Sequence, residues 1–237
     1  MGSIQKKNEM RLDDVEKNIG YVFKDKSLLI TSLTHSSYVN DRKNAKISSN
    51  ERMEFLGDSV LSLIVTEFLY RNNDGLNEGD MTKMRAMAVC ETTLAEHAKA
   101  LNIGNAMLIG KGEEITNGRN RPSMLADAFE AVLAAIFLDG GMVAAKEFMS
   151  KYLIQKPSKK ALYEATGDYK TLLQEQIQKT TKEKISYAMA STKGPEHEKM
   201  FEYNVLLNDK IVGHGCGKSK KVAEQKAAKQ ALKTLKT

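Results

Sequence analysis

The hydrophobic positions divide the chain into two parts with different periodicity. Up to residue 154, apolar side chains recur at intervals of three and four residues, which predicts a succession of helices over residues 10–19, 26–33, 50–70, 80–101, 123–138 and 142–154. From residue 168 the pattern predicts a helix over 168–179, then alternating segments over 185–189, 200–207 and 210–215, then a helix over 219–236. The sequence thus predicts an all-α domain followed by a small α+β domain of order α-β-β-β-α.

Charge and proline mark the expected boundary between the two domains. Pro157, Lys159 and Lys160 interrupt the helical pattern, and the stretch that follows them up to Gly167 reads as a connecting segment. We therefore expect a helical domain over residues 1–155, a linker over 156–167 and the α+β domain over 168–237.

The net charge of +6 is concentrated at the C-terminal end. Residues 168–237 carry 14 basic and 8 acidic side chains, whereas the first 167 residues carry 22 of each. This asymmetry predicts a polyanionic partner for the C-terminal domain, although solubility alone would also account for it. The absence of a long uninterrupted apolar run and the polar N-terminus predict neither a membrane span nor secretion. Cys90 and Cys216 are expected to be free thiols in a reducing cytoplasm.

Three carboxylates share one face of the helix expected over 50–70. At about 100° per residue, Glu51, Glu54 and Asp58 fall within roughly 60° of one another. Five apolar residues are expected to form the buried side of the same helix: Met53, Leu56, Val60, Leu63 and Ile64. Because like charges repel, the acids require either full solvation or a cation among them.

A second pair of acids lies in an otherwise apolar helix. Asp127 and Glu130 are the only charged residues between 123 and 138, and their spacing makes them neighbours on one face. Burying two carboxylates requires cationic partners or a metal ion. Arg52 and Arg85 could supply the cations, so a metal site and an arginine clamp both stand as interpretations. His35 has no recognisable catalytic partner and is interpreted as a structural histidine.

The glycine-rich segment 213–219 carries a different signal. It fails the spacing of a nucleotide phosphate-binding loop, because Val212 stands where the first glycine is required. Lys218, Lys220 and Lys221 instead lie at the start of the last helix, where free N–H groups and the helix dipole also attract phosphates. A solvated lysine cluster is the alternative interpretation.

The chain resembles the ribonuclease III family over almost its whole length. The stretch Asn50-Glu51-Arg52-Met53-Glu54-Phe55-Leu56-Gly57-Asp58 is similar to the family's signature. Further similarity lies in 33–35, in Glu78-Gly79-Asp80-Met81, in Leu125-Ala126-Asp127 with Glu130, and in the C-terminal double-stranded-RNA-binding domain. The resemblance implies an all-helical endonuclease domain that forms a homodimer.

The resemblance also implies which residues form the sites. It implies that Glu54, Asp58, Asp127 and Glu130 surround divalent metal. It also assigns Asp58, Glu130, Glu51 and Glu78 to catalysis, the last two as further acids of the cleft that engage RNA or support catalysis. The residues of the C-terminal domain that it assigns to RNA are Thr171, Gln174, Glu175, Gln178, His197, Lys218, Lys220 and Lys221. His197 belongs to a loop that would enter a second minor groove of the duplex.

The expected function follows from the chemistry and the resemblance together. Carboxylate ligands without His or Cys suit Mg²⁺, with Mn²⁺ able to substitute. The family hydrolyses both strands of double-stranded RNA by metal-activated water and leaves 5′-phosphate and 3′-hydroxyl ends with short 3′ overhangs. The resemblance therefore implies processing of ribosomal-RNA precursors and other structured transcripts. No nucleotide cofactor and no membrane are expected. Two alternatives are a non-catalytic double-stranded-RNA-binding protein and a metal-dependent phosphohydrolase of small nucleotides.

Overall fold

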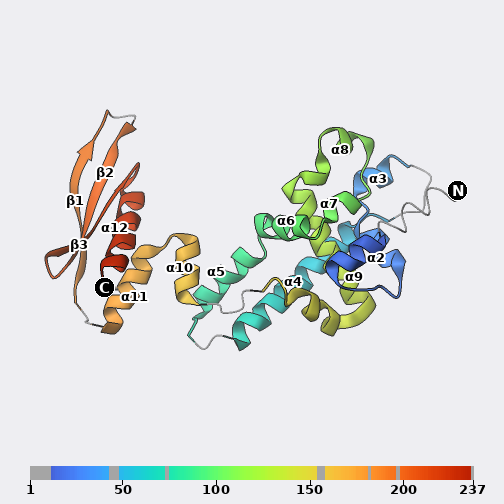
Figure 1. The fold of residues 1–237 in the computed structure, drawn as a ribbon, viewed down its shortest axis with the longest axis horizontal. Coiled ribbons are helices and arrows are strands. Elements are labelled where there is room, and N and C mark those ends of the chain that lie inside the picture. The colour runs from blue at the N-terminus through green and yellow to red at the C-terminus, as the bar shows by residue number, and fades with distance from the viewer. Residues whose placement is uncertain are drawn as a thin grey trace. The chain divides into compact units, whose positions relative to one another are not determined.

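The computed structural model describes residues 12–42, 48–72, 75–153, 158–180, 183–195 and 198–235, and the chain divides into two compact units after Lys156. The N-terminal unit is helical (Figure 1). Residues 12–19 form its first described helix. The elements that follow are α2 (Lys26–Ser32), α3 (Ser36–Asn40), α4 (Glu51–Arg71), α5 (Glu78–Ala88), α6 (Glu91–Ala100), α7 (Ile103–Ala106), α8 (Lys111–Ile115), η1 (Gly118–Asn120) and α9 (Pro122–Met149).

Helix α9 is the centre of this unit. Its residues from 131 to 136 are all fully buried, and it packs against α4, α6 and α2. Gly141, with φ of 73°, breaks its helical geometry, as the Gly140-Gly141 pair predicts. By length and apolarity alone, α9 would also qualify to cross a membrane, with a mean hydropathy of 1.7. Three other helices cover α9, so its apolar composition is that of a buried core helix.

Two details differ from the sequence prediction in this unit. The helix expected over 80–101 is two helices, α5 and α6, separated at Val89 and Cys90. The carbonyl of Met87 accepts a hydrogen bond from Thr93 Oγ1 at 2.9 Å, so a side chain replaces the backbone donor that a continuous helix would supply. The sequence also favours Asp80 as the N-cap of the helix expected over 80–101. That prediction is wrong, because α5 begins at Glu78 and Asn77 Oδ1 accepts from the Asp80 N–H.

The C-terminal unit places helices on one side of a three-stranded sheet (Figure 1). Its elements are α10 (Lys159–Thr166), α11 (Tyr169–Thr180), β1 (Ile185–Lys193), β2 (Met200–Leu207), β3 (Lys210–Gly217) and α12 (Lys220–Thr234). The strand order is β1-β2-β3 and both pairings are antiparallel. The predicted order α-β-β-β-α is therefore confirmed. The stretch interpreted as a linker contains α10, because Leu162 and Tyr163 are buried and stabilise a helix there.

Glycine allows α12 to pack closely on β3. Gly213, Gly215 and Gly217 alternate along the strand and face the helix. A Cβ atom at Gly215 would lie 2.3 Å from both the carbonyl oxygen of Ala223 and the backbone nitrogen of Ala227. The start of α12 is therefore held against the sheet by backbone contact, with almost no intervening side chain.

We expect Gly215→Ala to lower the free energy of unfolding of the C-terminal unit by roughly 2–3 kcal/mol, because the added methyl has no space and the helix must move away. Chemical denaturation of the full chain, followed by a probe in this unit, measures the effect. Cys216→Ala is the matched control, since side chains alternate along a strand and Cys216 points to the other face of the sheet. Equal stability of both variants and the wild type would contradict the close packing.

Candidate active site

The candidate active site lies where α4 crosses α9. The crossing point is Gly57, where an added Cβ atom would lie 2.0 Å from the carbonyl oxygen of Glu130. Glu54 and Asp58 flank Gly57 on one helix, and Asp127 lies one turn before Glu130 on the other. The two pairs of acids, at least 69 residues apart in the sequence, therefore meet through a backbone contact between their helices.

Electrostatics within the site follow from this juxtaposition. Burial, followed by repulsion from Asp58, raises the pKa of the Glu130 carboxyl to about 8, and Glu54 and Asp127 act in the same direction. Burial also raises the pKa of Glu54, with contributions from the charges of Asp127 and Glu51. The four acids thus form one cluster of negative charge at a partly buried position.

In the part of the chain that the structure describes, no lysine or arginine forms an ion pair with this cluster. Among the ion pairs within the described residues, none involves Asp127 or Glu130, and Arg85 instead donates to Thr66 Oγ1 at 3.3 Å. Arg52 is exposed and also forms none of these ion pairs, so the arginine clamp is not formed. Nearby, His35 opposes the rise of the Asp127 pKa that burial causes. The imidazole has a structural role as predicted, since its Nδ1 accepts from the Ser37 N–H at the start of α3.

The donor set fits a hard divalent cation, because it consists of carboxylate oxygens alone. In the described parts of the chain, no three acidic, histidine or cysteine side chains converge closely enough to hold an ion together. Repulsion between the negative charges keeps the carboxylates apart. A divalent cation among them would attract all of them and so draw them together. The residues that could hold a metal are therefore Glu54, Asp58, Asp127 and Glu130.

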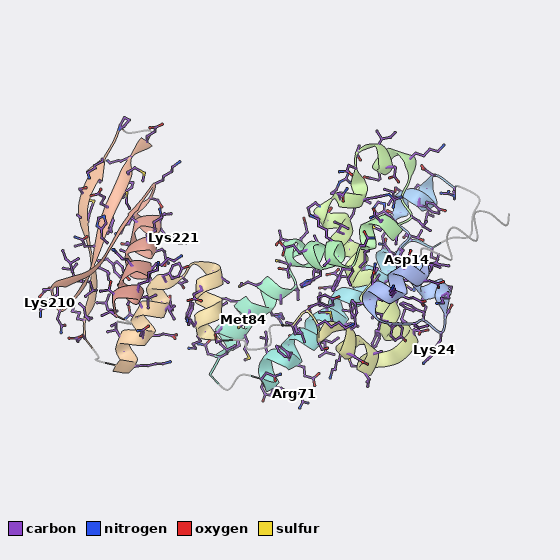
Figure 2. The ribbon with its side chains drawn as sticks, in the orientation of Figure 1. Asp14, Lys24, Arg71, Met84, Lys210 and Lys221 are labelled. Carbon is purple, nitrogen blue, oxygen red and sulfur yellow. The ribbon has the colours of Figure 1, made fainter. Side chains whose placement is uncertain are left out.

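The two further acids of the predicted cleft, Glu51 and Glu78, lie at the starts of α4 and α5. Glu51 is exposed at the start of α4, accepts a hydrogen bond from Ser49 Oγ, and contributes to the charge felt by Glu54. Glu78 lies at the start of α5 and lines a cavity of about 210 Å³ between α4 and α5. Figure 2 marks these two helices by Arg71, the last residue of α4, and Met84 on α5. The cavity places Glu78 beside Thr66 and Tyr70, about two and three turns beyond Asp58 on α4.

Helix α4 also carries an apolar surface that the sequence pattern misses. Phe55, Leu63 and Tyr70 are 80%, 55% and 75% exposed, and all three fall on one face of the helix. The prediction that Leu63 belongs to the core is wrong, because Leu61 and Val65 take the buried side. One signal was present in the sequence, since Phe55 shares its face with polar Ser59, Ser62 and Thr66.

In the C-terminal unit, α11 and the start of α12 carry most of the residues that the family resemblance assigns to RNA. Gln174 and Gln178 are exposed on α11, and Thr171 lies on the same face one turn earlier. Glu175 is hydrogen-bonded to Lys159 Nζ and Tyr163 Oη of α10, both at 3.1 Å. His197 lies outside the described residues.

The three lysines lie at the N-terminal end of α12. Lys218, Lys220 and Lys221 are exposed, and Ser219 caps the helix between them by accepting from the Val222 N–H at 3.3 Å. Figure 2 labels Lys221 on this helix. Exposed backbone N–H groups and three ammonium groups therefore coincide, which is an arrangement that attracts phosphate.

Both units match known protein families. Residues 25–157 match the family described as Ribonuclease-III-like, and residues 169–235 match the double-stranded RNA binding motif. Ribonuclease 3 of Caldanaerobacter subterraneus subsp. tengcongensis is 48% identical over 224 residues, covering 93% of this chain and 96% of that protein. Ribonuclease 3 of Oceanobacillus iheyensis is 45% identical over 226 residues, covering 95% and 99%.

A solved structure gives the same result for the helical unit. The nuclease domain of ribonuclease III from Campylobacter jejuni, described for flexibility in its dimer-forming region, has a TM-score of 0.56 and 41% identity, covering 60% of this chain and 95% of that one. The fold and the acid cluster define a helical endonuclease unit joined to a double-stranded-RNA-binding unit. The chain belongs to the ribonuclease III family, and it is an endoribonuclease.

Proposed function

We propose that this enzyme hydrolyses both strands of double-stranded RNA with Mg²⁺, or Mn²⁺ in its place, and leaves 5′-phosphate and 3′-hydroxyl ends with short 3′ overhangs. The observation that carries the proposal is the crossing at Gly57, which brings Glu54 and Asp58 beside Asp127 and Glu130. Ribosomal-RNA precursors in the cytoplasm are the proposed substrates.

The acids have separate tasks in this proposal. Glu54, Asp58, Asp127 and Glu130 would hold the metal, directly or through water, and Asp58 and Glu130 would lie next to the reacting phosphate. When bound, the divalent cation supplies Lewis-acid stabilisation of the phosphate and lowers the pKa of the attacking water. Glu51 and Glu78 are proposed as further acids of the cleft, supporting RNA binding or catalysis.

RNA recognition is proposed to follow groove geometry. The wide minor groove of A-form RNA presents 2′-hydroxyl groups, which Thr171, Gln174 and Gln178 can contact with little regard to sequence. The residues proposed for the remaining contacts are Glu175 and His197 in the minor grooves, and Lys218, Lys220 and Lys221 at phosphates. For Glu175 to contact RNA, its hydrogen bonds to α10 must be exchanged for bonds to the duplex.

The test is cleavage of a long RNA duplex by the purified chain, with Mg²⁺, with Mn²⁺ and with chelator. We expect cleavage only with a divalent cation, no cleavage of the corresponding DNA duplex, and products whose 5′ ends are phosphorylated. Binding without cleavage in every condition would favour the non-catalytic RNA-binding protein. Hydrolysis of mononucleotides in place of duplex would favour the small-nucleotide phosphohydrolase.

The chain is also proposed to act as a homodimer through α4. The exposed apolar face formed by Phe55, Leu63 and Tyr70 supports this, since exposed large apolar side chains gathered on one helix mark interaction surfaces. A dimer with one cluster per chain would place two sites on one duplex, so that both strands are cut.

We expect Phe55→Glu to shift the chain from dimer to monomer and to reduce double-strand cleavage, because a charge would be buried in the apolar interface. Sedimentation at micromolar concentration measures the change. Ile115→Glu is the matched control, since Ile115 is 85% exposed on α8, away from this surface. A Phe55→Glu variant that remains dimeric would place the interface elsewhere.

A further inference from the structure

A network of side chains joins the N-terminal ends of α11 and α12. The Gln225 side chain accepts a hydrogen bond from the Lys170 N–H at 2.9 Å and donates one to Asp168 Oδ1 at 3.1 Å. Asp168 also accepts from Thr171 Oγ1 at 2.8 Å. The first N–H groups of a helix have no partner within it, so a residue of α12 completes the cap of α11.

A buried charge reinforces this junction. Glu224, only 7% exposed, pairs with Lys170 Nζ at 2.7 Å and lies 3.9 Å from Lys220 Nζ. Lys170 Nζ in turn lies 4.4 Å from the centre of the Tyr187 ring on β1. One carboxylate of α12 thus holds a lysine of α11 and a lysine of the proposed phosphate-binding group.

The junction connects the two surfaces to which RNA binding is assigned. Thr171 and Gln174 begin one surface, and Lys220 and Lys221 form the other, about 50 residues later in the sequence. The minor groove and the phosphates of an A-form duplex have a fixed spacing, so both surfaces bind together only if their separation is also fixed. Within the described residues, Glu224 and Gln225 are the side chains of α12 that hydrogen-bond to the start of α11.

We propose that Glu224 and Gln225 are positioning residues for duplex RNA binding, which hold α11 and the lysines of α12 at the spacing of the RNA groove without contacting RNA themselves. This inference rests on the proposed RNA-binding role of the C-terminal unit. According to this proposal, the negatively charged side chain of Glu224 strengthens the binding of a negatively charged RNA.

The direction of the change in RNA affinity in Glu224→Gln therefore tests the proposal. If charge alone mattered, removal of a carboxylate near the lysines would strengthen RNA binding. The positioning role predicts the opposite, a roughly tenfold weaker affinity, which corresponds to the loss of one hydrogen bond to a charged group. Glu183→Gln is the charge-matched control, because Glu183 accepts from Asn208 Nδ2 beyond the other end of α11 and is not part of the junction.

Gln225→Met provides a second variant that leaves the charge unchanged. It removes both hydrogen bonds to the start of α11, so we expect weaker RNA binding together with faster amide hydrogen exchange at Lys170. A role in stability alone would leave the affinity unchanged at a temperature where the unit is fully folded.

The experiment measures binding of the full chain, in chelator, to an RNA duplex longer than about 16 base pairs, the length that one such domain spans. Circular dichroism verifies that each variant is folded at the temperature used. Weaker binding by both variants, with Glu183→Gln equal to or tighter than wild type, supports the inference. Wild-type affinity or better in the folded Glu224→Gln and Gln225→Met variants overturns it. Failure of the wild type to bind duplex RNA would instead overturn the proposed function.

Discussion

Replacing Glu130 by glutamine is expected to reduce cleavage of duplex RNA by about a thousandfold, since several kcal/mol of metal-dependent stabilisation would be lost. Duplex binding in chelator should be unchanged, because the groove and phosphate contacts proposed for the C-terminal unit do not involve Glu130. In chelator the variant should unfold at a temperature no lower than the wild type, because glutamine resembles the protonated acid that the raised Glu130 pKa of about 8 favours.

The matched control for this prediction is Glu147→Gln. Glu147 lies on the same helix, is exposed, and is far in sequence from the crossing with α4. A thermal shift on adding Mn²⁺ gives a readout that does not depend on cleavage. The wild type and Glu147→Gln should be stabilised by the ion through mass action, and Glu130→Gln should be stabilised less. Equal stabilisation of all three would remove Glu130 from the metal ligands.

Gly57→Ala is expected to lower the cleavage rate by about a hundredfold, although it changes no acid. The new methyl group would lie 2.0 Å from the Glu130 carbonyl oxygen, so α4 and α9 must move apart. A displacement of about 1 Å between catalytic groups costs on the order of a hundredfold in rate. Overpacking should also lower the free energy of unfolding by roughly 1–3 kcal/mol.

Gly112→Ala on α8 is the matched control, because it makes the same glycine-to-alanine change at a position away from the helix crossing. A Cβ atom at Gly112 meets nothing within 4 Å, so this variant should cleave at the wild-type rate and be slightly more stable through higher helix propensity. Steady-state kinetics below the unfolding temperature measure both variants. Wild-type cleavage by Gly57→Ala would refute the role of the helix crossing.

Much of the fold was predictable because local patterns agree with it. The apolar run from 124 to 138 predicts the buried helix, and Gly140 with Gly141 predicts its interruption. Asp25 directly precedes the helix expected over 26–33, which favours it as the N-cap, and its side chain does accept from the Ser27 N–H at the start of α2. The break between α5 and α6 was not predictable, because no glycine or proline marks it and the Thr93 hydroxyl that replaces the lost backbone donor is an ordinary helix residue in the sequence.

The candidate site was also predictable only in part. The sequence placed Glu54 and Asp58 on one face of a helix, and Asp127 and Glu130 on one face of another. Helical periodicity cannot say that the two faces meet. A glycine inside a strongly apolar helix was the available signal, because it costs about 1 kcal/mol relative to alanine and a packing reason usually accounts for it.

By itself, then, the sequence determined the elements of both units, the acids, the basic charge of the C-terminal part and the family to which they point. Only the tertiary structure decided that α4 and α9 cross at Gly57, that neither Arg52 nor Arg85 pairs with the acids, and that Glu224 and Gln225 join α11 to α12. The physical reason is that periodicity and capping act between residues a few positions apart. Helix crossings, buried ion pairs and inter-helix caps join residues far apart in the sequence, and only packing brings them together.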